Sequence, residues 1–352
     1  IGSAGQVLQA QAGAPTWTDL PNNRNVIVNG GFDVWQRGGA AVTVAGYNAD
    51  QWITGSTGST FSMTRQTFAV GNVITGQEPA FYHRNVVTSV ANVANFVSDI
   101  QRIESVRMFA GQTVTLSFWA KADANKNIAI ELVQSFGTGG APSADVTAIG
   151  AQLVALTTAW TRFSATIAVP SISGKTLGTT NDGFLAVNLW SDAGSNFNAR
   201  TASLGQQSGT FDTWGVQLEA GSVATAFERP SAADQLARCQ RYFVRYGGNS
   251  LFENIGSSGF TITTSSATAL VILPVQMRAN PSVLANAAAN FQIIDSAAAT
   301  VTPSTLALSA SGASPRIVEL SLGSAALFTA GRFIYVRANN TTAAALDISA
   351  EL

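Results

Sequence analysis

The sequence predicts an all-β protein made of two tandem antiparallel β-sandwiches of the jelly-roll kind, joined by a short helix. Three observations carry this prediction. Short runs of alternating apolar and polar residues recur along most of the 352 residues, as expected for half-buried strands. Helical composition is confined to one stretch near the middle of the chain, at 231–240. The chain is also long enough for two domains that each bury a core.

Residues 21–230 are expected to form the first sandwich. Nine or more alternating runs, separated by Gly, Asn, Ser and Pro and without a helical pattern among them, favour two sheets packed face to face. Within a strand the alternation assigns the core face, so that Val114, Leu116 and Phe118 share the buried side. The clearest runs are 61–68, 81–87, 96–103, 128–136, 162–169, 184–190 and 210–218.

A change of composition after Pro230 marks the end of the first domain. Ser231 stands at an N-cap position and Asp234 follows in the first turn, while Arg238 comes near the end. This order of acid before base suits the helix dipole. Residues 231–240 are therefore predicted to form a short helical hinge between two sheet domains.

The two ends of the chain differ in character. Residues 1–20 are rich in Gly, Ala and Gln and too weakly apolar to fold alone, so they form either a segment joined to other structures or a disordered tail. Residues 241–352 are predicted to form a smaller antiparallel β-sandwich of a common domain size. Its expected strands are 241–246, 260–264, 269–273, 291–294, 317–322 and 332–337.

Charge is scarce in this protein. Only 11% of the residues are charged and the net charge is −1, against roughly 25% charged residues in an average globular protein. Such a balance gives no electrostatic footprint for nucleic acid or an anionic membrane, and no stretch approaches the roughly 18 apolar residues that span a bilayer. We therefore expect neither nucleic-acid binding nor membrane insertion.

Aromatic and polar side chains are expected on the outer faces of three strands of the first sandwich. By alternation, Trp119, Glu131, Asn188 and Trp190 all point away from the core. A sugar ring offers an apolar C–H face to an aromatic plane and hydroxyls to amide and carboxylate groups, so these four are the candidate glycan-binding residues. The alternative is that loops or a neighbouring subunit cover the two tryptophans. The remaining tryptophans of the domain are assigned to packing: Trp35, Trp52, Trp160 and Trp214.

Catalytic groups are few. The single histidine, His83, and the single cysteine, Cys239, cannot make a zinc site or support a catalytic triad. His83 is therefore expected to be a structural or surface residue, and Cys239 a small buried one. Glycoside hydrolysis needs two carboxylates about 5 to 10 Å apart, and a pair such as Asp182 and Asp192 stays open at this point. We predict that the protein is not an enzyme and assign no catalytic residue.

The end of the first domain and the hinge carry a family resemblance. The stretches VQLEAGSVATAFERP (216–230) and LARCQRYF (236–243) resemble the junction of bacteriophage tail-fibre and receptor-binding proteins. Pro230 stands where a second Arg is usual, and Gln235 replaces an acid. The first twenty residues, with GSAGQVL and PTW, are similar to the segment that joins a fibre shaft to its tip in the same family.

This resemblance implies a function and a setting. It implies a receptor-binding tail fibre of a phage virion, a homotrimer that contacts other virion tail proteins through its N-terminal segment and binds host surface polysaccharide outside the cell without cleaving it. Two other functions stay open. One is a purely structural virion component such as a collar, whisker or decoration protein. The other, which we favour less, is a polysaccharide depolymerase.

The first domain also resembles, more distantly, the jelly-roll carbohydrate-binding modules that open with an NG-x-F-(D/E) strand. The matching residues here run from Asn29 to Asp33, and the acid of the closing strand would be Asp212. In such modules the two acids and nearby backbone carbonyls can hold a structural Ca²⁺, a hard cation that prefers oxygen ligands. The resemblance therefore implies a calcium site at Asp33 and Asp212. The alternative is that both acids cap turns or pair with Arg37.

Overall fold

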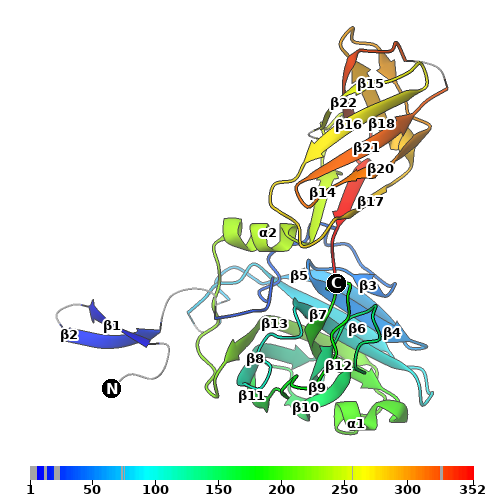
Figure 1. The fold of residues 1–352 in the computed structure, drawn as a ribbon. Coiled ribbons are helices and arrows are strands. Elements are labelled where there is room, and N and C mark those ends of the chain that lie inside the picture. Colours follow the sequence, from blue (N-terminus) through cyan, green and yellow to red (C-terminus); the bar gives the residue numbers. More distant parts are fainter. Residues whose placement is uncertain are drawn as a thin grey trace.

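A computed structural model describes residues 6–11, 14–19, 24–72, 74, 76–255, 257–325 and 328–352. The ribbon in Figure 1 shows two β-sheet bodies with a helix between them and a hairpin near the N-terminus. The architecture is all-β with antiparallel sheets, which confirms the predicted fold class. The hairpin pairs β1 (Gln6–Gln11) with β2 (Ala14–Asp19). It lies within the predicted segment 1–20, whose other residues fall outside the described part of the chain.

Two sheets between β3 and β13 pack against each other, and we call them together the first β-sandwich. The six-stranded sheet has the order β10 (Val146–Leu156), β9 (Lys126–Ser135), β12 (Phe184–Ala193), β7 (Phe96–Glu104), β4 (Trp52–Thr57) and β3 (Gly46–Tyr47). The five-stranded sheet has the order β11 (Thr161–Ala168), β8 (Thr113–Ala122), β13 (Gly209–Ala220), β6 (Phe81–Thr88) and β5 (Thr60–Thr67).

Apolar side chains from both sheets fill the space between them. Val114, Leu116 and Phe118 of β8 are fully buried and belong to one cluster with Leu185 and Val187 of β12. This confirms the core face that alternation assigned. Burying each such side chain stabilises the fold by about 1.5–3 kcal/mol. The same cluster contains two of the tryptophans assigned to packing, Trp35 and Trp52.

A short helical segment follows β12 and covers part of the six-stranded sheet. It consists of η1 (Ser195–Phe197) and α1 (Asn198–Thr201). Phe197 packs on Trp190, with ring centroids 5.3 Å apart, and α1 also contacts β9 and β10. The outer face of the sheet is therefore closed at this point by the chain itself.

The predicted hinge forms α2 (Ala232–Gln240). The Ser231 hydroxyl accepts a hydrogen bond from the backbone N–H of Asp234 at 3.2 Å, which is the N-cap contact that the sequence suggested. Arg238 lies in the last turn, and Cys239 is fully buried. Burial raises the pKa of the Cys239 thiol well above its ordinary value, as suits a packed structural cysteine rather than a reactive one.

The remaining strands make two further antiparallel sheets, which we call the second β-sandwich. Its core contains Val271, Phe291 and Val336, all fully buried. The three-stranded sheet has the order β14 (Phe243–Gly247), β23 (Ala345–Ser349) and β17 (Ser282–Ala285). The seven-stranded sheet has the order β19 (Thr300–Val301), β18 (Phe291–Asp295), β22 (Phe333–Ala338), β15 (Ser257–Thr261), β16 (Ser266–Ile272), β21 (Ile317–Gly323) and β20 (Thr305–Ala313), and η2 (Ala288–Asn290) precedes β18.

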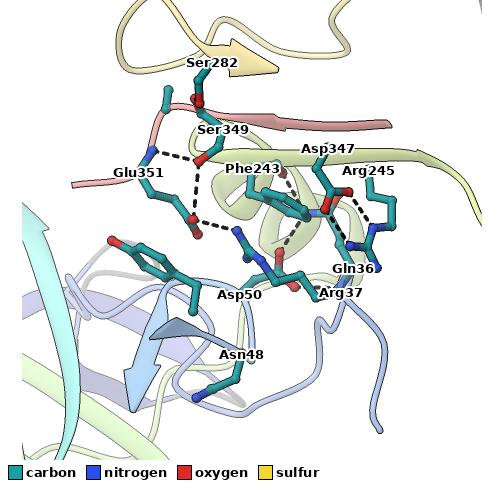
Figure 2. A network of polar contacts seen from close by, with 12 residues as sticks. Gln36, Arg37, Asn48, Asp50, Phe243, Arg245, Ser282, Asp347, Ser349 and Glu351 are labelled. Atoms are coloured by element: carbon teal, nitrogen blue, oxygen red, sulfur yellow. Dashed lines mark hydrogen bonds and ion pairs between the residues drawn. The ribbon is translucent and has the colours of Figure 1, made fainter. Parts of the chain in front are cut away.

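Polar contacts join the two sandwiches. Figure 2 shows Arg37 of the first β-sandwich between the Phe243 ring and the Glu351 carboxylate. The guanidinium carbon lies 3.5 Å from the ring centroid, and a nitrogen lies 2.6 Å from the carboxylate. Gln36 also donates to the Phe243 carbonyl at 2.8 Å. The exact boundaries at 20, 230 and 240 stay a prediction, because sheet membership does not show which part folds alone.

Candidate functional site

The four predicted glycan-binding residues do not share a surface. Trp119 lies on β8 in the five-stranded sheet, whereas Glu131 on β9 and both Asn188 and Trp190 on β12 belong to the six-stranded sheet. The expectation of one outer face is therefore wrong. Alternation fixes the side of a strand on which a residue lies, but it does not fix the sheet that the strand joins.

Glu131, Asn188 and Trp190 form a buried polar cluster instead of an open site. The Glu131 carboxylate accepts hydrogen bonds from Asn188 Nδ2 at 2.9 Å and from the Trp190 indole N–H at 3.2 Å. Arg200 of α1 closes the cluster with an ion pair at 2.5 Å and lies over the Trp190 ring. Glu131 has no exposed surface and Trp190 is 2% exposed. These contacts fix α1 to the sheet.

Trp119 is also covered by its own chain. Only 5% of it is exposed, and its ring lies 5.3 Å from the Trp214 ring and 6.4 Å from that of Phe227. Arg162 lies above the ring and donates a hydrogen bond to the Thr225 carbonyl. The segment after β13 therefore lies on Trp119, which bears out the alternative that loops cover these tryptophans.

An accessible row of charged residues lies on the outer face of the five-stranded sheet. Strand register places Lys121 of β8 opposite Asp212 of β13, and Asp212 opposite Arg84 of β6. Arg84 holds the Asp212 carboxylate with two bonds of 2.7 and 2.8 Å, and Lys121 Nζ lies 3.4 Å from it. The two cations are partly exposed, whereas the carboxylate beneath them is buried. We call these three residues the charged row.

Aromatic rings flank the charged row. The Trp160 ring stands edge-on to Tyr82 at 5.3 Å and packs on Phe68 at the same distance. Lys121 Nζ lies 5.5 Å from the centre of the Trp160 ring. Arg84 donates to the Tyr82 hydroxyl at 3.2 Å. Trp160 is only partly buried, so an aromatic edge and cationic donors reach solvent together.

The protonation states on this face are those that suit hydrogen bonding to hydroxyl groups. Hydrogen bonds to Asp212 raise the pKa of Arg84, and burial raises the pKa of Tyr82. The surface therefore offers cationic donors beside the partly buried Trp160 ring, while the neutral Tyr82 phenol is buried next to them. This combination is what recognition of a sugar requires. We take the charged row, Tyr82 and Trp160 as the candidate glycan site.

Sequence reasoning missed most of this site. Trp160 was assigned to packing, and it does pack, but incompletely. Alternation along 81–87 does place Tyr82 and Arg84 on the side opposite the buried Val87, so a signal existed. Nothing in the sequence showed that β6, β13 and β8 are neighbours, because their residues are far apart along the chain.

The residues expected to bind calcium have cationic partners instead. Asp33 pairs with Arg229 at 3.0 Å rather than with Arg37, and Asp212 belongs to the charged row. In the part of the chain that the structure describes, no group of three or more His, Cys, Asp or Glu residues could hold a metal ion. Both carboxylates therefore have cationic partners, whereas Ca²⁺ prefers six to eight oxygen ligands, and the calcium site at Asp33 and Asp212 stays a prediction.

The carboxylates left open for hydrolysis do not suit that role. Asp182 precedes β12 and Asp192 lies near its other end, so a separation of about 30 Å follows from the rise of an extended chain. Hydrolysis needs about 5 to 10 Å. Asp192 is buried and bonded to Ser59 at 2.6 Å. Hydrogen bonds from Thr138 lower the pKa of Asp182 to about 2, which is unsuited to a general acid.

His83 lies in the interior of the first β-sandwich. It is fully buried against the Phe32 ring, 5.2 Å away, and its Nε2 atom is 3.8 Å from Asp99. Burial lowers its pKa, so the imidazole is neutral at physiological pH. Of the two alternatives expected for His83, structural and surface, this location supports the structural one.

Three grooves of similar size lie beside α2 rather than at the charged row, and the largest of these, of about 590 Å³, is lined by Ser231, Asp234 and Arg238 among others. One of about 570 Å³ is lined by Trp35, Arg229 and Leu236 among others, and one of about 510 Å³ by Ile103 and Tyr242 among others. Their polar walls are engaged in contacts between the two sandwiches or along α2, such as the ion pair of Glu104 with Arg241. None of the helices in the described ranges has the length and apolar character to cross a membrane.

One family model matches a part of the chain that includes most of the first β-sandwich. Residues 24–192 match the family model described as "Carbohydrate binding domain". No curated protein matches the chain. Remote likenesses include a solved structure described as "CBM4 structure and function", with 18% identity over 55% of this chain and 98% of the other and a TM-score of 0.31. The CBM22-2 xylan-binding domain from Paenibacillus barcinonensis has 17% identity over 49% of this chain and 94% of the other, with a TM-score of 0.31.

A phage protein also resembles this chain. The enzymatically active domain of tailspike protein 4 from bacteriophage CBA120 has 14% identity over 56% of this chain and 22% of the other, with a TM-score of 0.33. Identities and TM-scores this low carry no argument about function. The family match over 24–192 and the sandwich of two antiparallel sheets support a carbohydrate-binding jelly-roll domain in the first half of this protein.

Proposed function

We propose that the protein is a receptor-binding tail fibre of a phage virion, and that its first β-sandwich binds a polysaccharide of the host surface without cleaving it. The observation that carries the binding role is the match of residues 24–192 to a carbohydrate-binding family. The virion setting rests on the resemblance of the stretches 216–230 and 236–243 to tail-fibre junctions. The protein acts outside the host cell, at its surface.

Binding is assigned to the charged row and its aromatic flank. The apolar face of a sugar packs on the edge of Trp160, while Arg84 and Lys121 donate to hydroxyl or carboxylate groups of the polymer. Asp212 holds the two cations in place through the contacts of 2.7 and 3.4 Å. A row with two outward cations favours glycans that carry acidic groups.

The assembly part of the proposal is a homotrimer that contacts other virion tail proteins through residues 1–20. A charge fraction of 11% supports subunit contacts, because the cores of interfaces are depleted in charge. Each glycan contact can then be weak, since three linked sites gain roughly 10²- to 10⁴-fold in avidity where the geometry permits.

Adsorption of the labelled full chain to candidate host cells tests the proposal. Periodate oxidation of the cells destroys surface glycans and is expected to abolish adsorption. Trp160→Ala and Arg84→Ala are expected to weaken it at least tenfold. Adsorption is compared at a temperature at which both variants are folded, because Arg84→Ala leaves the buried Asp212 carboxylate with Lys121 as its remaining ion-pair partner and lowers the melting temperature. Arg229→Ala removes an exposed cation from a different surface and is the matched control.

Four results would contradict parts of this proposal. Adsorption that survives periodate argues for a protein receptor. Adsorption that is unchanged in Trp160→Ala and Arg84→Ala places the site elsewhere. Absence of adsorption to every plausible host favours the alternative of a purely structural virion component, such as a collar, whisker or decoration protein. Release of new reducing ends from the polysaccharide would replace attachment with depolymerase activity.

A further inference from the structure

The outer face of the seven-stranded sheet carries large apolar side chains that are open to solvent. Phe333 is 77% exposed and Ile272 is 71% exposed. Four more side chains on the same sheet are between 38% and 49% exposed: Phe260, Leu270, Ile317 and Tyr335. Soluble proteins rarely leave so many large apolar groups together, and such a patch marks an interaction site.

Strand register places these side chains on one face. Phe333 of β22 is directly opposite Phe260 of β15, and Ile272 of β16 is directly opposite Ile317 of β21. Directly opposed residues of an antiparallel pair lie on the same side of the sheet. Leu270 and Tyr335 share that side because they are two residues from Ile272 and Phe333 in their strands. We call these six residues the apolar face.

Few charged groups lie on this face, and Glu319 and Arg337 have hydrogen-bond partners within the same chain. Glu319 is opposite Leu270, and its carboxylate accepts a hydrogen bond from the Thr268 hydroxyl at 2.7 Å. At the other margin Arg337 is bonded to Gln292 at 2.9 Å and lies over the Phe252 ring. Glu319 and Arg337 have opposite signs, so together they add no net charge that would repel an identical surface.

The area of the apolar face is of the size that a specific interface needs. Large side chains bury 150–250 Å² each when they are enclosed, so the exposed fractions above correspond to on the order of 600 Å². A standard interface covers roughly 800 Å² per partner, with an apolar centre and a polar rim. The apolar face with Glu319 and Arg337 at its margins fits that description.

We infer that copies of this chain associate through the apolar face of the second β-sandwich. This inference rests on the proposed function in one respect: the apolar face is the contact surface of the proposed homotrimer. The glycan site lies on the first β-sandwich, so assembly and glycan binding use different surfaces. Figure 1 shows the seven-stranded sheet, with β15, β16 and β22, in the body away from α1.

Sedimentation of the full chain over a range of concentrations tests this inference. The wild type is expected to have the mass of three chains, as the proposed homotrimer requires, and the double variant Phe333→Asp with Ile272→Asp is expected to raise the dissociation constant at least tenfold. Val70→Asp is the control, because Val70 is almost fully exposed but belongs to the first β-sandwich. A wild type that stays monomeric overturns the inference, as does a double variant that associates like the wild type.

A second measurement covers the case in which the double variant does not fold. Ile272→Cys and Val70→Cys each add one reachable thiol, since Cys239 is buried. The cysteine at 272 is expected to react with a maleimide more slowly as protein concentration rises, while the one at 70 reacts at a constant rate. Equal behaviour of both overturns the inference. Loss of glycan adsorption with association intact would instead count against the proposed function.

Discussion

Arg200→Met tests the conclusion that the Glu131 cluster is structural. The substitution keeps most of the side-chain length but removes the guanidinium that lies 2.5 Å from Glu131. Glu131 has no exposed surface, so its charge would be left buried with only the neutral donors Asn188, Trp190 and the Ala148 N–H. Breaking a buried ion pair in this way costs about 3–5 kcal/mol.

The exposed pair between Arg229 and Asp33 offers a matched control. Both side chains of that pair are about a third exposed, 34% and 27%, and surface ion pairs contribute only about 0–1 kcal/mol. Arg229→Met is therefore expected to change the free energy of unfolding much less than Arg200→Met. The double variant Glu131→Gln with Arg200→Met is expected to regain part of the loss, because it removes the unpaired charge.

Thermal and urea unfolding, followed by tryptophan fluorescence, measure these effects. A loss of 3–5 kcal/mol lowers the melting temperature of a domain of this size by roughly 10 °C. Glycan adsorption by the fraction that remains folded is expected to be unchanged. If Arg200→Met melted like Arg229→Met, the cluster would not hold α1 to the sheet. If adsorption were lost without a change in stability, Glu131 and Trp190 would be binding residues after all.

Two further predictions concern the contacts between the two β-sandwiches and the packing within the first β-sandwich. Burial raises the pKa of Glu351 to about 7 against an ordinary value of 4.5, with Arg37 opposing the shift and Asp50 adding to it. The protonated form of Glu351 stabilises the fold fully below pH 4.5, and this contribution is lost as pH rises through 7, so the free energy of unfolding falls by about 3 kcal/mol. The free energy of unfolding of Glu351→Gln is expected to lack this decline. Parallel pH profiles of the variant and the wild type would contradict the assignment. Gly30→Ala would place a Cβ atom 2.0 Å from the Val216 carbonyl oxygen, and it is expected to lower the free energy of unfolding by about 3 kcal/mol. Gly55→Ala is the control in the same unfolding assay, because the nearest atom to its added Cβ is 3.6 Å away.

Local features of the chain were sufficient to predict the fold class and the helix at the hinge. The alternation at Val114, Leu116 and Phe118 depends only on the two-residue period of a strand, and these residues are buried as predicted. Capping of α2 by Ser231 depends on atoms within one turn and is present. Neither Cys239 nor His83 was expected to take part in chemistry, because no partners for chemistry exist in the sequence, and both are buried.

The candidate site could not be predicted from the sequence, because it forms where strands that are far apart along the chain pair with one another. Alternation turned Trp119, Glu131 and Trp190 outward, and each does lie on the outer side of its sheet. It could not show that α1 and the segment around Phe227 return to cover them. The apolar face of the second β-sandwich was missed because alternation within one strand does not show which strands pair with it.

The sequence by itself determined the period of the strands, the position of the helix and the poverty of charge, because each depends on residues that are neighbours along the chain. The tertiary structure decided which strands are neighbours in a sheet and which outer faces stay open. Arg84, Lys121 and Asp212 meet only because β6, β13 and β8 are adjacent. Such long-range pairing is set by the packing of the whole core, and no local pattern encodes it.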